Sequence, residues 1–137
     1  MKTAVVCYTL GGTTRAFARA EAQARGADLI ELRPARPYHL FTAFVRGCPA
    51  AIRGQAVPLA QAPDLSGYDA IVLLSPIWAG HPAPPFNSAV ALLPAGASVE
   101  VVLVSGSGAS KCAGRVRAQI EGRCCTLAAL RDVRPHR

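Results

Sequence analysis

The chain has no long apolar run, and it is poor in charged and aromatic residues. Its longest purely apolar stretches, such as residues 70–74 and 101–104, are much shorter than the roughly 20 residues that a membrane-spanning helix requires. Only 17% of the 137 residues are charged, whereas 51% are hydrophobic. This balance excludes a disordered chain, and the length supports one domain, residues 1–137, with one core.

A targeting segment and a metal motif are also missing. The apolar stretch after Lys2 is only a few residues long and is followed by a Gly-Gly-Thr-Thr turn, which favours a buried first strand over a signal peptide. The five cysteines are odd in number and show neither Cys-x-x-Cys nor Cys/His ligand spacing. We therefore expect a cytoplasmic protein with reduced thiols, mostly in the core, and no metal site. Cys48, in a polar segment, is the one thiol whose reactivity merits a test.

No set of residues for hydrolytic or acid–base catalysis can be assembled. His39, His81 and His136 lie in unrelated contexts, and no pair of carboxylates has a suggestive spacing. His81 closely follows the only tryptophan, so it fits a proton donor beside a ligand and a solvated loop histidine about equally well. We therefore predict no catalytic residue.

Positive charge exceeds negative charge, with a formal net charge of +7. Residues 1–54 carry eight Lys or Arg against three acids, residues 55–110 carry none against three, and residues 111–137 carry seven against two. The basic residues are nearly all Arg and are spread singly. This pattern favours a solvated surface, and we predict no nucleic-acid partner. A basic patch for a phosphate-rich partner is the alternative.

Strand-like and helix-like segments alternate along the chain, which indicates βαβ units and a parallel sheet. The predicted strands are residues 3–8, 27–32, 70–75, 99–104 and 124–130. The predicted helices are residues 14–25, capped by Thr13 or Thr14 and ended by Gly26, then 87–93, and 110–121 closed by Gly122. Residues 34–63 are predicted to be irregular, with a short helix at 41–45, and residues 76–85 to be a proline-rich loop.

The loop after the first strand, from Tyr8 to Arg15, is suited to an anion. Its glycines let the backbone approach closely, and N–H groups at the start of a helix, together with threonine hydroxyls, can donate hydrogen bonds. A phosphate monoester fits this arrangement, and so does an ordinary turn with a capping threonine. The loop lacks the Gly-Lys-Ser/Thr ending of a P-loop and the Gly-x-Gly-x-x-Gly pattern of dinucleotide-binding folds.

Two further loops follow predicted buried strands. Trp78, in the segment from Ser75 to Pro85, can offer a flat face to a planar ring, and the neighbouring prolines would stiffen its loop. The Gly/Ser loop at residues 105–109 has unhindered backbone N–H groups. These loops and the first one are expected around a single crevice at the carboxyl ends of the strands, where open α/β sheets bind ligands.

The first loop resembles that of the flavodoxin-like family, which reads roughly Tyr-Ser-x-Ser/Thr-Gly-Asn-Thr and binds the phosphate of flavin mononucleotide (FMN). The matching residues here are Thr9, Gly12, Thr14 and Arg15. The chain departs from the family at two positions, where Gly11 replaces a hydroxyl residue and Thr13 replaces asparagine. These departures remove one hydroxyl and one amide from the expected phosphate site.

Residues 64–85 are similar to the family's block Asp-Leu-Ser-x-Tyr-Asp-x-Ile…Pro-Ile-Trp-x-Gly-x-Pro-Ala-Pro-Pro, whose loop packs against the isoalloxazine ring. Residues 37–54 resemble the excursion between the second and third strands of short family members. The resemblance covers nearly the whole chain. It implies an α/β, three-layer, doubly wound sandwich with five parallel strands in the order 2-1-3-4-5.

With FMN as the implied cofactor, the contacts are expected from Thr9, Leu10, Gly11, Gly12, Thr13, Thr14, Pro76, Ile77, Trp78, Ala79, Gly80, Ser105, Gly106, Ser107 and Gly108. The leading function is electron transfer with redox partner proteins or small-molecule acceptors. One alternative is an FMN-dependent oxidoreductase that passes hydride from NAD(P)H to a quinone. Another is a degenerate flavodoxin fold without FMN that serves as an interaction module.

We expect no counterpart of the last helix of this topology, because only seven residues follow residue 130 and Pro135 is among them. Residues 71–74 and 101–104 are apolar on both faces, so a monomer is expected to expose a large apolar patch. We therefore expect a homo-oligomer, most simply a two-fold dimer, without membrane insertion. The alternative is that the tail or residues 37–54 fold over that face.

Overall fold

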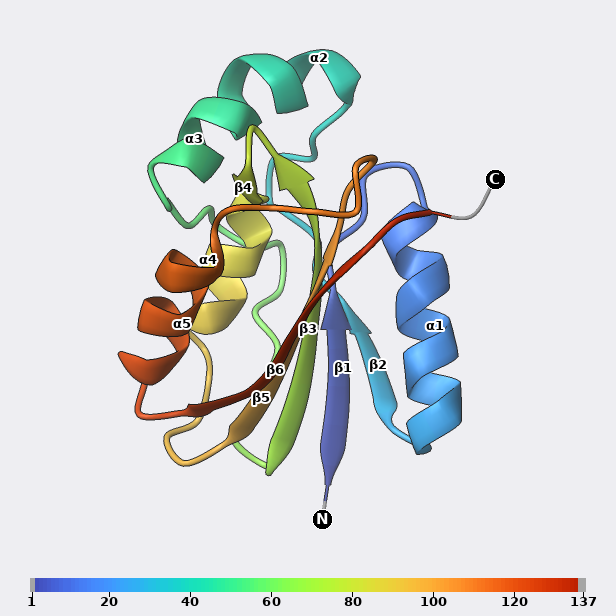
Figure 1. Ribbon diagram of the computed structural model, residues 1–137, viewed down its shortest axis with the longest axis vertical. Coiled ribbons are helices and arrows are strands. Elements are labelled where there is room, and N and C mark those ends of the chain that lie inside the picture. The colour runs from blue at the N-terminus through green and yellow to red at the C-terminus, as the bar shows by residue number, and fades with distance from the viewer. Residues whose placement is uncertain (1, 136–137) are drawn as a thin grey trace.

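The predicted strands form one parallel sheet in the computed structural model, which describes residues 2–135 (Figure 1). The strands are β1 (Thr3–Cys7), β2 (Asp28–Glu31), β3 (Ala70–Trp78), β5 (Ser98–Val104) and β6 (Thr126–Val133). They lie in the order β2-β1-β3-β5-β6, and every neighbouring pair along this path is parallel. The expected α/β class and the strand order 2-1-3-4-5 are thus confirmed.

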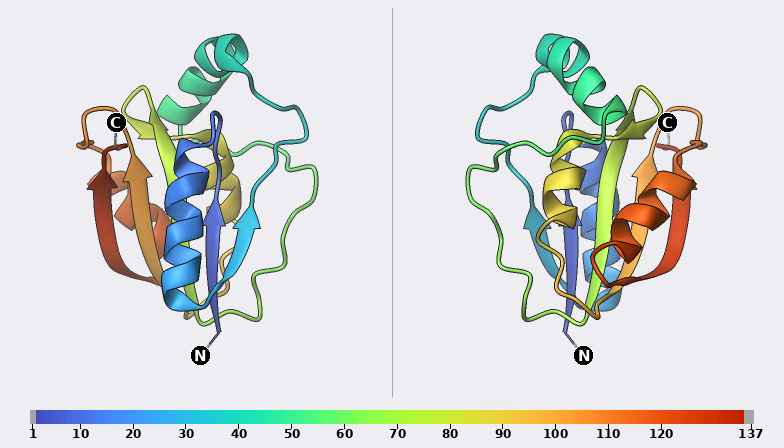
Figure 2. Two further views of the ribbon diagram at one scale, coloured as in Figure 1. Left: turned by 90° about the vertical axis from the view of Figure 1, so that its right-hand side faces the viewer. Right: turned by 90° about the vertical axis from the view of Figure 1, so that its left-hand side faces the viewer.

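Helices cover both faces of the sheet (Figures 1 and 2). On one face lies α1 (Thr13–Arg25), whose Ala18 and Ala22 pack with Val72 of β3 in the smaller core. On the opposite face lie α4 (Pro84–Val90) and α5 (Ala113–Glu121), which enclose the larger core. Alternate residues of the same strands feed the two cores, and this explains why β3 and β5 are nearly continuous apolar runs.

The segment at residues 76–85 is a β-hairpin followed by the start of a helix, rather than the predicted proline-rich loop. The strand β3 continues to Trp78 and turns through Ala79 and Gly80 into β4 (His81–Pro82). Both turn residues have positive φ, 52° and 84°, as in the two-residue turns typical of hairpins. Proline is tolerated in this part of β3 because β1 has already ended opposite Leu74, so one side of the strand has no partner there.

Residues 40–52 form one helical segment, which is longer than the short helix predicted at 41–45. It consists of α2 (Leu40–Thr42), the π-helical turn η1 (Ala43–Gly47) and α3 (Cys48–Ile52). In the π-helical turn, the N–H of Cys48 donates to the carbonyl of Ala43, five residues earlier. Pro49 comes next and has no N–H to donate, and the wider turn accommodates it without ending the helix.

The cysteines differ from expectation at two positions. Cys48 begins α3 and is half-buried, so it does not lie in a polar loop. Cys124, which was expected inside the last strand, is exposed and adopts a positive φ of 59° just before β6. Cys124 is therefore the better target for a thiol reagent.

The predicted boundaries of α1 are correct, but its cap is not. The helix begins after Gly12, whose φ of 97° is readily adopted only by glycine, so neither Thr13 nor Thr14 caps it. It ends at Gly26 as predicted, with a left-handed φ of 61°.

The other two helices are displaced slightly from their predicted ranges. The helix α4 begins at Pro84, three residues earlier than expected, because proline fits the first turn of a helix, where no N–H donor is needed. The helix α5 begins at Ala113 rather than at residue 110. Gly122 ends it as predicted, although with an ordinary φ of −64°.

The sheet face beside α1 is covered within the chain. No helix follows β6 within the described residues, yet the side chains of 71–74 are at most 2% exposed and those of 101–104 at most 5%. Ion pairs from α1 add to this cover, since Glu21 pairs with Arg25 (2.8 Å) and with Arg131 of β6 (2.6 Å), and Arg25 also pairs with Glu100 of β5. The expectation that these strands would expose a large apolar patch is therefore wrong, because α1 and this ion-pair network cover them.

Within residues 2–135, no helix has the length and hydropathy needed to cross a membrane. The same residues contain no cluster of three or more His, Cys, Asp or Glu side chains that could hold a metal ion.

Candidate functional site

Two loops and the end of one strand meet at the carboxyl end of the parallel strands, where the sequence predicts three loops. The two loops follow β1 and β5, the strand end is formed by Pro76 and Ile77 of β3, and together they surround a hollow of about 230 Å³. The predicted site residues that line it are Thr9, Leu10, Gly11, Thr13, Thr14, Pro76, Ile77, Ser105 and Gly106. Val104 and Pro135 also line the hollow, and sequence reasoning missed both because their positions depend on where β5 and β6 end.

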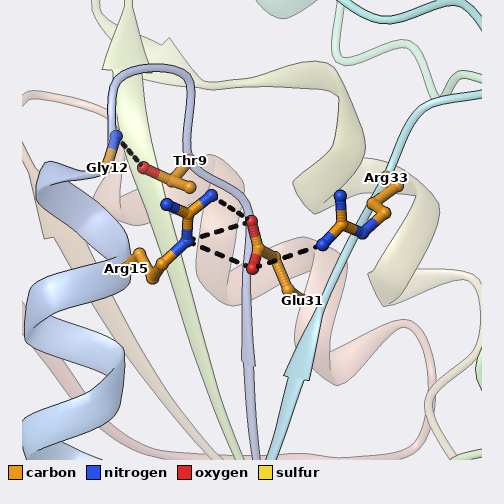
Figure 3. Close-up of polar contacts among 5 residues, drawn as sticks. All are labelled: Thr9, Gly12, Arg15, Glu31 and Arg33. Carbon is orange, nitrogen blue, oxygen red and sulfur yellow. Dashed lines mark hydrogen bonds and ion pairs between the residues drawn. The ribbon is translucent and has the colours of Figure 1, made fainter.

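The first loop is shaped by a hydrogen bond between two of its own residues. The N–H of Gly12 donates to Oγ1 of Thr9 at 2.9 Å, which closes a tight turn before α1 (Figure 3). Gly12 itself lies outside the hollow's lining, and its contribution is the positive φ that lets α1 start there. No atom lies within 4 Å of the position that a Cβ on Gly11 would occupy, so the backbone at Gly11 is open to a ligand.

Arg15, which matches the family pattern, is not among the residues that line the hollow, and it points toward Glu31 at the end of β2 (Figure 3). Its Nη2 lies 2.7 Å from Oε1 of Glu31, and its Nε lies 3.2 Å from both carboxylate oxygens. Arg33 lies at 3.9 Å on the other side of the same carboxylate. The hydrogen bonds from Arg15 hold the pKa of Glu31 below its usual value. The guanidinium of Arg15 is thus paired with the carboxylate of Glu31 and is not free to bind a phosphate.

Trp78 lies outside the lining of the hollow, in a cluster of aromatic rings. Its ring centroid is 5.7 Å from that of Tyr8 and 5.2 Å from that of Tyr38, both nearly perpendicular to it. The backbone of Gly47 lies directly against the indole, because a Cβ added to Gly47 would be only 2.4 Å from Cζ3 of Trp78. The indole packs with Tyr8 and Tyr38 against the larger core, so it is not free to face the hollow.

The aromatic cluster was not predicted as a unit, because Tyr8, Tyr38 and Trp78 come from three distant parts of the chain. Ala79 and Gly80 likewise lie outside the lining, and they form the hairpin turn. Burial raises the pKa of Tyr8 well above its usual value, so its hydroxyl stays protonated in neutral solution.

Several backbone N–H groups of the loop at residues 105–109 already donate hydrogen bonds within the protein. The N–H of Ser105 donates to Val133, and that of Gly108 donates to the carbonyl and hydroxyl of Ser105. The N–H of Ala109 donates to the hydroxyl of Ser107 at 3.3 Å. Of the predicted contacts, Ser105 and Gly106 line the hollow, whereas Ser107 and Gly108 shape the loop.

His81 lies in β4 beside Arg115 of α5, a partner that sequence reasoning missed. The Nη1 of Arg115 is 3.2 Å from Nδ1 of His81 and donates at 3.1 Å to the carbonyl of Ala51. Burial and the positive charge of Arg115 lower the pKa of His81. The imidazole is thus a neutral acceptor for Arg115, and the pair ties the hairpin to α3 and α5.

No protein-family model matches the chain, and no curated protein matches it. Solved structures do. A candidate flavoprotein from Bacteroides eggerthii superposes with a TM-score of 0.78 at 20% identity, covering 95% of this chain and 86% of the other. A flavoprotein from Lactobacillus acidophilus in complex with FMN gives 0.75 at 18% identity, covering 98% and 93%.

Oxidised flavodoxin 1 from Bacillus cereus is similar at a TM-score of 0.57 and 16% identity, covering 100% of this chain and 86% of the other. Likeness at such low identity establishes architecture alone. Together with the strand order and the positions of the loops after β1 and β5, it shows that this chain has the flavodoxin-like fold.

Proposed function

We propose that this protein binds FMN in the hollow at the carboxyl end of the sheet and transfers electrons through it. The observation that carries the proposal is the convergence of the loops after β1 and β5 and the end of β3 on one hollow, at the crevice where folds of this type hold ligands. The flavoprotein from L. acidophilus, which has the same fold, was crystallised with FMN, and this supports the choice of cofactor.

The residues of the hollow fit the phosphate end of FMN. The open backbone at Gly11, the start of α1, and the hydroxyls of Thr9, Thr13 and Thr14 provide neutral donors for an anion. The hollow, at about 230 Å³, is smaller than the roughly 300–1,000 Å³ of pockets that enclose a ligand of this size. The phosphate and part of the ribityl chain would be held inside, and the ring would extend beyond it.

Apolar side chains flank the route along which the ring would extend. Pro76 and Ile77 of β3, Val104 of β5 and Pro135 all line the hollow. These residues exclude water from one part of the ring, while Gly106 leaves a gap for its edge because no atom lies within 4 Å of a Cβ there. When bound, FMN supplies the one- or two-electron chemistry, and the protein positions it. The cytoplasm is the compartment we propose for this activity.

The first test is flavin binding. Protein freed of flavin is titrated with FMN and, separately, with FAD, and binding is followed by absorption and by flavin fluorescence. We expect one FMN per chain and weaker binding of FAD, because the hollow accepts a terminal phosphate. A protein that stays colourless after incubation with FMN would overturn the proposal and favour an interaction module. Equal or tighter binding of FAD would overturn the choice of FMN.

A second assay separates a carrier from an enzyme. The FMN-loaded protein is mixed with NADH or NADPH and a soluble quinone, and oxidation of the nicotinamide is followed by absorption. A carrier shows no sustained oxidation but exchanges electrons with a chemical reductant. Steady turnover would replace electron transfer by the FMN-dependent oxidoreductase activity.

A substitution pair tests the phosphate site. Gly11→Thr combined with Thr13→Asn restores the two groups that the loop lacks, and Gly11 has open space for a side chain. We expect tighter FMN binding in this variant. Gly12→Ala is the contrasting variant, and it should weaken binding because alanine is strained at φ 97°. Unchanged affinity in both would place the phosphate elsewhere.

A further inference from the structure

The helical segment at residues 40–52 packs through its smallest side chains and displays its largest. Ala43, Gly47 and Ala51 are buried. On the outward side lie Leu40, Phe41, Phe44 and Val45, exposed by 82%, 70%, 77% and 50%; we call these four residues the apolar tip. This is the reverse of an amphipathic helix that stabilises its own core.

The fold does not need the apolar tip to hold the segment in place. Gly47 lies against Trp78, and Arg115 donates to the carbonyl of Ala51 at 3.1 Å, so the attachment is on the inner side. Four adjacent large apolar side chains with such exposure mark an interaction surface, since soluble proteins seldom keep such a cluster in water without use for it.

The charge around the apolar tip restricts its partner. Residues 32–63 contain four arginines and no aspartate or glutamate. Arg36 and Arg53 are exposed, and the guanidinium of Arg46 lies 5.4 Å from the ring centroid of Tyr38. A second copy of this chain, docked through the same surface, would bring like charges together. The partner surface is therefore anionic.

The shape favours a lipid surface over an acidic protein. The segment projects past the ends of the strands at one extremity of the molecule (Figures 1 and 2). Specific protein interfaces use about 20–30 residues a side, which a projecting tip of four apolar residues does not provide. Shallow insertion into a membrane interface requires only a few apolar side chains with basic residues beside them.

We propose that the apolar tip inserts into the interfacial region of an anionic lipid membrane, with Arg36, Arg46 and Arg53 beside the headgroups. The protein would lie on such a membrane without crossing it. The proposal does not depend on FMN, because the apolar tip and the hollow share no residues.

The experiment is co-sedimentation of the purified full chain with vesicles of phosphatidylcholine alone or of equal parts phosphatidylcholine and phosphatidylglycerol. Wild type should sediment with the anionic vesicles, weakly or not at all with the neutral ones, and less at high salt. Phe41→Ser with Phe44→Ser should reduce partition roughly tenfold or more. Arg36→Gln with Arg53→Gln should reduce binding to anionic vesicles alone.

Leu29→Ser is the matched control, because Leu29 is 41% exposed but lies on β2, away from the apolar tip. It should bind like wild type. Thermal unfolding of each variant checks folding, and the exposed phenylalanines should be replaceable without loss of stability. The proposal is overturned if wild type does not sediment with anionic vesicles, or if the folded double-serine variant sediments equally. A self-association that the serines abolish, without lipid binding, would instead assign the apolar tip to a second copy.

Discussion

At Gly47, two distant parts of the chain lie in close contact. Its missing side chain lets the helical segment rest on the indole of Trp78. Gly47→Ala should therefore destabilise the protein by about 1–3 kcal/mol, the usual cost of overpacking. Chemical denaturation measures this change.

Gly114 supplies the control for Gly47. It lies in α5, and no atom lies within 4 Å of its Cβ position. Gly114→Ala should leave stability unchanged or raise it by up to about 1 kcal/mol, because alanine favours helices. If both substitutions had the same effect, the contact between Gly47 and Trp78 would not constrain the fold.

Whether the indole of Trp78 stacks on the flavin ring determines whether the hairpin contacts bound FMN. Trp78 is the only tryptophan, and stacking on the ring stays a prediction, since the indole packs against Tyr8 and Tyr38. If it stacks, FMN should quench its fluorescence, and Trp78→Ala should weaken binding by about one to two decades, using the roughly 1–3 kcal/mol known for bases on aromatic side chains.

Trp78→Phe separates packing from stacking. It keeps an aromatic side chain between Tyr8 and Tyr38, so a loss of affinity in the alanine variant alone would reflect the cluster. Unquenched fluorescence with unchanged affinity in the alanine variant would remove Trp78 from the site.

At the scale of elements, His81 and Arg115 connect β4 to α5. Because burial and Arg115 lower the pKa of His81, the unfolded chain binds a proton more readily than the folded one. Stability should thus be complete above about pH 6.5, the value for an unperturbed histidine, and should fall as the pH drops through the lowered folded value. Urea midpoints across this range measure the effect.

His81→Asn should remove this part of the pH dependence, because the asparagine oxygen can accept from Arg115 without titrating. His39→Asn is the control at an exposed position. An unchanged profile in the His81 variant would mean that other groups cause the loss. Glu31, whose pKa is lowered by hydrogen bonds from Arg15, contributes only in more acidic solution.

Local patterns predicted most elements but not the hairpin. Alternating βαβ signals were sufficient for five strands and three of the helices, since short apolar runs mark the strands and the segments between them carry helix signals. The prolines between Ser75 and Pro85 obscured the extension of β3, because whether proline fits a strand depends on whether a neighbour lies beside it.

At the scale of the whole molecule, a homodimer stays a prediction, but the argument for it is now a hollow beside α1 and no longer exposed apolar strands. The sheet strands are buried, but a hollow of about 500 Å³ lies beside α1, lined by Thr13, Ala16, Phe17, Ala20 and Pro135. We expect a two-fold dimer to use this hollow. Sedimentation velocity at micromolar concentration should give twice the 14.3 kDa chain mass.

Ala20→Arg should shift such a dimer to monomer, because Ala20 is exposed and lines that hollow. Phe41→Ser with Phe44→Ser should leave it unchanged. A wild-type protein that sediments as a monomer would rule out the dimer at that concentration.

The sequence by itself determined the parallel sheet and the loops after β1 and β5, because buried strands, glycine turns and helix starts are encoded by adjacent residues. The strand order followed from the resemblance to flavodoxin-like proteins. Only the tertiary structure decided which side chains meet. In the folded chain Trp78 packs against Tyr8 and Tyr38, and Arg15 forms an ion pair with Glu31. Ion pairs among Glu21, Arg25, Glu100 and Arg131 cover the α1 face of the sheet. Except for the pair of Glu21 and Arg25, which lie four residues apart in α1, these contacts join residues from different elements, so no local pattern contains them. Their outcome depends on packing and charge pairing in three dimensions.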